Sequence, residues 1–102
     1  MAYIAGYSHI TLASVPAEIK DEVWLSFESW VGWLQSFPGM MDVSMAAREL
    51  ANGDIRFLIR TRWQYPEQLE AWASSKWAAD KLLLAFPKPA YDITGEAFME
   101  LD

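Results

Sequence analysis

His9 is the residue of this sequence best suited to proton transfer, and it is the only histidine in the chain. An imidazole titrates near neutral pH, so it can act as a general base or as a ligand to a metal or to haem iron. The alternative is a strand residue that only forms a hydrogen bond. No Asp or Glu stands at ligand spacing from His9, so the sequence predicts neither a zinc nor a non-haem iron site.

Two aromatic residues further along the chain are the next candidates for a functional site. Trp63 ends a predicted strand, where its ring can pack against the following helix or point its indole N–H at a ligand oxygen. Tyr65 stands where a helix usually carries Ser, Thr, Asp or Asn, and its hydroxyl is too distant to cap the backbone. A residue that breaks a local rule can mark a functional position, so Tyr65 is included among the candidate catalytic residues.

Two arginines, Arg60 and Arg62, lie on the other face of the strand that Trp63 ends. Ion pairs with Asp42, Asp92 or Glu96, formed across strands or across a dimer, are the expected role, and an anion site in the barrel interior is the alternative.

Several common catalytic patterns are missing from the sequence. It contains no G-x-S-x-G nucleophile elbow, its five glycines are scattered, and it has no cysteine. The sequence therefore predicts no serine hydrolase, no phosphate loop, no disulfide and no thiolate metal site. The Asp and Glu residues are expected on the solvated surface.

Charge and composition limit the partners. The net charge of −6 and the pI of about 4.6 argue against nucleic acid and against anionic membranes, both of which attract basic surfaces. The segment from Met1 to Ile10 lacks the basic region of a signal peptide, and no apolar run approaches the ~18 residues of a membrane span. Together with the absence of cysteine, these features favour a cytoplasmic protein.

The hydrophobic patterns predict one domain over residues 1–102 with the order β-α-β-β-α-β. The strands are expected at Tyr3–Leu12, Met40–Leu50, Asp54–Trp63 and Tyr91–Leu101, and Asn52-Gly53 predicts a type I′ hairpin. One helix follows Ser14-Val15-Pro16 and ends before Phe37-Pro38-Gly39. A second starts at Pro66 and is interrupted at Ser74-Ser75, after which Trp77, Leu82 and Leu83 lie on a further segment. Gly95 is expected at a bulge or a close approach of two segments.

This order predicts an α+β, ferredoxin-like fold, in which a four-stranded antiparallel sheet carries both helices on one face. The other face would leave Leu58 and part of the second strand in water. A second copy that packs sheet to sheet would cover these residues, so the sequence predicts a homodimer.

The residues at the connections between these elements resemble those of the antibiotic biosynthesis monooxygenase-like family of dimeric α+β barrel proteins. The resemblance rests on Phe37-Pro38-Gly39, on Trp63 at a strand end and on Pro66-Glu67-x-Leu69-x-x-Trp72 before the Ser-rich break, and it covers residues 3 to 101. It implies a cleft between the helices and the sheet. The family includes cofactor-independent monooxygenases that oxidise aromatic substrates and haem-degrading monooxygenases.

The match to the haem-degrading branch is partial. That branch combines an Asn on the first strand, a Trp at the end of the third strand and a His on the last helical region. Trp63 matches the Trp and Ser8 falls near the Asn, but Lys81 and Leu82 stand where the helical His would be. The resemblance therefore makes a helical haem ligand doubtful.

The resulting expectation is a small cofactor-independent monooxygenase that binds a hydrophobic or aromatic substrate in this cleft. A non-catalytic binding domain for haem or another hydrophobic molecule is the alternative. The candidate catalytic residues are His9, Trp63 and Tyr65, and the candidate substrate-binding residues are Tyr7, Ser8, Phe27, Trp72 and Trp77. Strand alternation puts Tyr7 and His9 on one face and Ser8 on the other, so all three cannot line one pocket.

Overall fold

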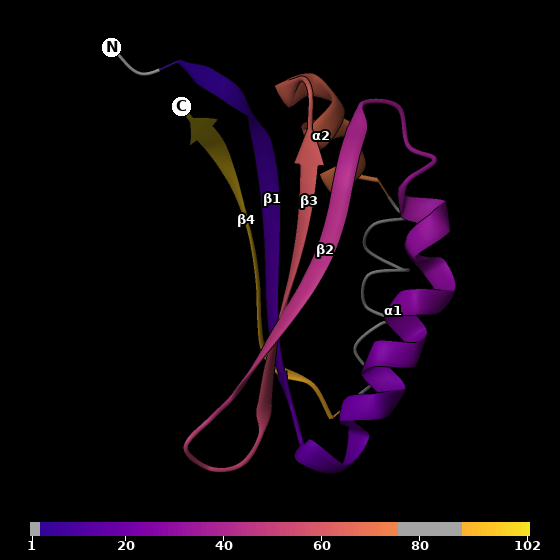
Figure 1. The fold of residues 1–102 in the computed structure, drawn as a ribbon, viewed down its shortest axis with the longest axis vertical. Helices are drawn as coiled ribbons and strands as arrows, with labels where there is room; N and C mark the ends of the chain where they lie inside the picture. The colour runs from indigo at the N-terminus through magenta and orange to yellow at the C-terminus, as the bar shows by residue number, and fades with distance from the viewer. Residues whose placement is uncertain (1–2, 76–88) are drawn as a thin grey trace.

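The computed structural model describes residues 3–75 and 89–102 (Figure 1). The elements in chain order are β1 (Ile4–Val15), the 3₁₀ turn η1 (Ala17–Ile19), α1 (Lys20–Leu34), β2 (Met40–Glu49), β3 (Ile55–Trp63), α2 (Pro66–Ala73) and β4 (Tyr91–Leu101). The predicted segment that carries Trp77, Leu82 and Leu83 lies outside the described residues.

The four strands form one antiparallel sheet in the order β2-β3-β1-β4. The central strands β1 and β3 pair from Tyr7–Trp63 to Val15–Ile55, and β4 lies at the edge beside β1. This arrangement confirms the predicted ferredoxin-like fold.

The core lies between this sheet and the two helices, which cover the same face (Figure 1). Alternate residues of β1 and β3 point into it because side chains of a strand alternate between the two faces. The buried apolar residues are Ala13, Val15, Val23, Phe27, Leu34, Phe57, Ile59, Trp63, Leu69 and Trp72. The residues that α1 contributes to this core are Val23, Phe27 and Leu34. In the described part of the chain, no helix is both long and apolar enough to cross a bilayer.

The first strand is longer than predicted. It continues through Ser14 and Val15, which pair with Arg56 and Ile55 of β3. Instead of starting a helix, Ser14 accepts a hydrogen bond from the guanidinium of Arg56 at 2.7 Å, and α1 begins only at Lys20. The sequence signal of Ser followed by Pro was overridden by this pairing across the sheet.

The β2–β3 hairpin is confirmed, but the predicted type I′ turn is wrong. Gly53 has a φ of +90°, whereas Asn52 is not among the described residues with positive φ. The Leu50 N–H donates to the Asp54 carbonyl at 2.7 Å, and the Gly53 N–H donates to the Leu50 carbonyl at 2.9 Å. The loop thus has three residues, with a turn followed by a left-handed glycine, which is the next most common hairpin geometry.

The sheet face opposite the helices, here called the open face, carries an ion-pair cluster. Arg60 and Arg62 both pair with Glu100 of β4, the second through Nε to Oε2 at 3.0 Å. Within one chain, the partner is therefore Glu100 and not the predicted Asp42, Asp92 or Glu96, whereas a pairing across a dimer stays a prediction. The intervening residue of β1 is Ser8, whose small side chain lets both arginines reach across β1 to the edge strand.

Candidate functional site

A cleft opens on the helix face of the sheet, between α2 and the strands β1 and β4. Its volume of about 640 Å³ falls within the range of small-molecule sites. The side chains around it are mostly apolar, and the lining residues are Tyr7, His9, Pro66, Leu69, Glu70, Ala73, Gly95, Glu96, Ala97, Phe98 and Met99. We call it the α2–β4 cleft.

His9 lies at the base of this cleft, held from three directions. Its ring meets Trp72 of α2 edge to face, with centroids 5.3 Å apart and planes at 76°. Its Nδ1 lies 3.5 Å from the Thr11 hydroxyl oxygen. On the β4 side the ring approaches Gly95, where an added Cβ would lie 3.2 Å from Cε1 and 3.3 Å from Nε2. The prediction of a close approach at Gly95 is confirmed, and the missing side chain there is what leaves room for the imidazole.

Burial lowers the pKa of His9 below the ordinary value of 6.5, because the charged imidazolium loses hydration in this site. No carboxylate ion pair with His9 occurs among the described residues. At neutral pH the ring is therefore uncharged, with one nitrogen free to accept a proton.

Since His9 is the only histidine, its titration can be followed directly by NMR. We expect the midpoint of its ring Cε1–H resonance to lie below 6.5 in the folded protein and to return to about 6.5 in urea. The unfolded chain then binds a proton at higher pH than the folded chain does. Stability should therefore fall as the pH drops from 6.5 through the folded-state pKa. A folded-state midpoint at or above 6.5 would contradict this assignment.

Trp63 is fully buried beneath the site and does not present its indole N–H to the cleft. The N–H donates to the Thr61 hydroxyl at 3.0 Å, and that hydroxyl donates to the backbone carbonyl of His9 at 3.4 Å. Trp63 also packs against Trp72, with ring centroids 5.4 Å apart. Trp63 therefore reaches His9 only through other residues, which fits the packing role considered from the sequence.

Trp72 is buried between Trp63 and His9. Its indole N–H has no hydrogen-bond partner in residues 3–75 and 89–102, which is uncommon for a buried donor. A direct contact of Trp72 with a substrate stays a prediction.

The other predicted site residues are spread over the fold. Ser8 lies on the open face beneath Arg60, outside the cleft, and Phe27 is buried in the core on α1. Tyr65 is 52% exposed at the N-terminus of α2, where its side chain makes no capping hydrogen bond. Trp77 lies outside the described residues. Of the predicted residues that the structure describes, only Tyr7 and His9 line the α2–β4 cleft.

Sequence reasoning missed the contribution of β4. Ala97 and Met99 stand opposite His9 and Tyr7 in the β1–β4 register, so they share the helix face and form one wall of the cleft. The signal was available in the alternation of β4, but its use required knowing that β4 pairs with β1.

Charge around the cleft is of one sign. Glu70 and Glu96 are the charged residues in its described lining, and no lysine or arginine is found there.

No family model matches the sequence, and no curated protein is similar to it. Solved structures do match the fold. A candidate antibiotic biosynthesis monooxygenase from Deinococcus radiodurans is 16% identical and aligns over 98% of this chain and 92% of its own, with a TM-score of 0.70. The haem degrader MhuD from Mycobacterium tuberculosis, solved with two haems in its active site, is 20% identical over 92% and 94% of the two chains, with a TM-score of 0.68.

A third match is a dimeric protein of unknown function and ferredoxin-like fold from Bacteroides fragilis. It is 12% identical over 96% of this chain and 100% of its own, with a TM-score of 0.71. The chain has the ferredoxin-like fold of these proteins. The resemblance found in the sequence thus holds at the level of fold, which hosts more than one activity.

Proposed function

We propose that this chain is a small monooxygenase-like enzyme that acts without a cofactor on an aromatic or polycyclic substrate in the α2–β4 cleft. The observation that carries the proposal is His9, an imidazole kept neutral by burial at the base of an apolar cleft of about 640 Å³. A base with a pKa below the working pH is mostly unprotonated, and is thus ready to take a proton.

In the proposed reaction, His9 removes the proton of an acidic substrate such as an anthrone. The resulting anion is electron-rich enough to reduce dioxygen itself. A CH₂ group becomes C=O and one O₂ is consumed; one oxygen atom enters the product and the other leaves as water. The substrate supplies all four electrons, so the balance needs no other reductant.

The other residues would orient the reacting groups. Trp72 and Thr11 flank the imidazole, while Tyr7, Leu69 and Met99 offer surfaces against which an aromatic ring can pack. Trp63 is a positioning residue in this proposal, since it supports Trp72 and, through Thr61, the backbone of His9. A fixed base and an apolar wall that excludes water both favour reaction of the bound anion.

Haem binding is the second candidate, favoured by the neutral imidazole and by the likeness to MhuD. His9 could hold the iron of a bound haem, which would supply oxygen binding and reduction. The charges fit less well, because Glu70 borders the cleft and its described lining holds no lysine or arginine to pair with the two propionates of haem. Haem is therefore ranked second, and no reaction step is assigned to it.

Oxygen uptake tests the first candidate. Protein treated with a metal chelator and free of flavin is mixed with a dihydroxyanthrone-type substrate in an oxygen electrode. One O₂ should be consumed per substrate converted, at a rate above that of the protein-free blank. A rate equal to the blank would contradict the proposal. In parallel, a shifted Soret band after addition of haemin that persists with ascorbate would support the binding domain instead.

We further infer that two copies associate through the open face. The inference is supported by the structurally similar protein from Bacteroides fragilis, which is dimeric. Leu12 and Leu58 on this face, together with Phe98 of β4, would otherwise border water. Apolar area that is covered by a second sheet stabilises the assembly.

A substitution that buries a charge in the centre of the open face should dissociate the dimer. Light scattering is expected to give a dimer for the wild type at micromolar concentration and a monomer for Leu58→Asp. The matched control is Leu25→Asp, because Leu25 is 63% exposed on α1 and away from the open face. A monomeric wild type, or a Leu58→Asp variant that stays dimeric, would contradict this interface.

A further inference from the structure

All four arginines of this acidic chain project from the open face of the sheet. Two of them, Arg60 and Arg62, share the carboxylate of Glu100. The other two, Arg48 and Arg56, form no ion pair with a carboxylate in the described part of the chain. In the described part of the chain, Arg48 and Arg56 are therefore the two arginines of the open face whose guanidinium groups lack a carboxylate partner.

Arg48 of β2 and Arg56 of β3 stand directly opposite each other in the strand register. Like charges in this position destabilise a sheet unless a counter-charge lies nearby. Arg56 donates hydrogen bonds only to neutral acceptors among the described residues, the Ser14 hydroxyl at 2.7 Å and the Asp92 carbonyl at 3.2 Å. An anion placed beside both guanidinium groups would relieve the repulsion.

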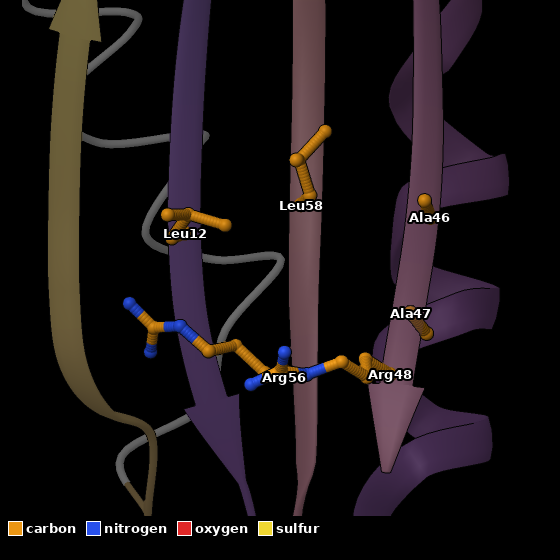
Figure 2. A pocket seen from close by; sticks show the side chains of 6 residues that line it. All are labelled: Leu12, Ala46, Ala47, Arg48, Arg56 and Leu58. Carbon is orange, nitrogen blue, oxygen red and sulfur yellow. The ribbon is translucent and has the colours of Figure 1, made fainter. Parts of the chain in front are cut away.

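The two arginines border a hollow of about 380 Å³ on this face. Figure 2 shows both side chains lying flat across the strands in the same direction, Arg48 from β2 over β3 and Arg56 from β3 over β1. Leu12, Leu58 and Ala46 lie next to this row, farther along the strands. We call this site, lined by Leu12, Ala46, Ala47, Arg48, Arg56 and Leu58, the arginine hollow.

We propose that the arginine hollow binds a small amphipathic carboxylic acid. The carboxylate would accept hydrogen bonds from the guanidinium groups, which match its geometry and can bind it in bidentate fashion. The apolar body would lie over Leu12 and Leu58. The volume is at the lower end of the range for small-molecule sites, which suits a ligand with a short chain or a single ring.

When a second copy covers the open face, the charged side of the hollow stays at the border of the interface, and the apolar body of the ligand would lie between the second copy and Leu12 and Leu58. The Arg48–Arg56 pair is next to the Glu49–Ile55 pair, the last pair before the hairpin loop. The charged side of the hollow is therefore at the end of the sheet. The site is distinct from the α2–β4 cleft, because it lies on the opposite face and shares no lining residue with it.

Calorimetric titration with octanoate and with octylammonium tests the proposal. The two probes share an apolar chain and differ in charge, and low salt limits screening of the contact. Octanoate should bind and octylammonium should not. Arg48→Gln should lower the affinity for octanoate about tenfold, which is the effect of losing one charge-assisted hydrogen bond. The control Lys20→Gln removes the same charge from α1, outside the hollow, and should change the affinity less than about twofold.

Three results would overturn the proposal. The first is no measurable binding of octanoate, and the second is equal binding of both probes. The third is unchanged binding of octanoate to Arg48→Gln, which would put the acid elsewhere, for example in the α2–β4 cleft. If Arg48→Gln instead weakens the dimer and octanoate fails to bind, the counter-charge comes from the second copy and the small-molecule site is wrong.

Discussion

Replacing Trp63 by alanine is expected to lower the free energy of unfolding by about 3–5 kcal/mol, as measured by urea denaturation followed by circular dichroism. The side chain has no exposed surface, packs against Trp72 and satisfies its N–H within the core. Its removal leaves a cavity that the rigid sheet beneath it cannot fill. A loss of this size is a large fraction of the total stability of a small domain, about 5–15 kcal/mol.

Trp24→Ala is the matched control for this prediction. Trp24 is 45% exposed on α1, so the same substitution there should cost less than about 1 kcal/mol. A third variant, Trp63→Phe, keeps the aromatic contact with Trp72 and loses the hydrogen bond to Thr61, which should cost about 1 kcal/mol beyond the change in packing. If Trp63→Ala costs no more than Trp24→Ala does, the core described here is wrong.

Replacing His9 by glutamine is expected to slow oxygen uptake by about 10²–10⁴-fold, the usual contribution of a general base. Glutamine retains polarity and approximate size but cannot take up a proton. The wild-type rate should fall as the pH drops through the lowered pKa of His9, because protonation removes the base. The rate should therefore persist to a pH below that at which an exposed histidine would lose activity.

Tyr65→Phe provides the comparison for this assay. Tyr65 is exposed, is absent from the described lining of the cleft and makes no capping bond, so this variant should keep most of the wild-type rate. Equal rates for His9→Gln and the wild type would exclude His9 as the base. A large loss in Tyr65→Phe with a small one in His9→Gln would reverse the two roles.

Most of the fold could be predicted because its signals are local. The alternation of β3 and the stop at Phe37-Pro38-Gly39 depend on residues close in sequence, and both were interpreted correctly. The hairpin turn was not, because its type depends on which residues of the two strands pair. The backbone bond between Leu50 and Asp54 makes the loop one residue longer than Asn52-Gly53 suggests.

The candidate site was less predictable because it depends on neighbours distant in sequence. His9 and Tyr7 were placed on one face by alternation alone. That Gly95, Ala97 and Met99 face them depends on the β1–β4 register, which leaves no local pattern. The hydrogen bond of the Trp63 N–H could have been predicted from the sequence. Thr61 precedes Trp63 by two residues, so it lies on the same face of the strand and offers a hydroxyl acceptor.

The edge position of β4 has a practical consequence for the search for a ligand. This strand forms one wall of the α2–β4 cleft, pairs with β1 on one side and exposes most of its residues. Such a strand opens locally more readily than the central strands do. A molecule that contacts both Leu69 of α2 and Met99 of β4 would keep β4 paired with β1. Slower amide hydrogen exchange in β4 would thus report occupancy of the cleft for compounds of unknown chemistry, before any turnover is measured.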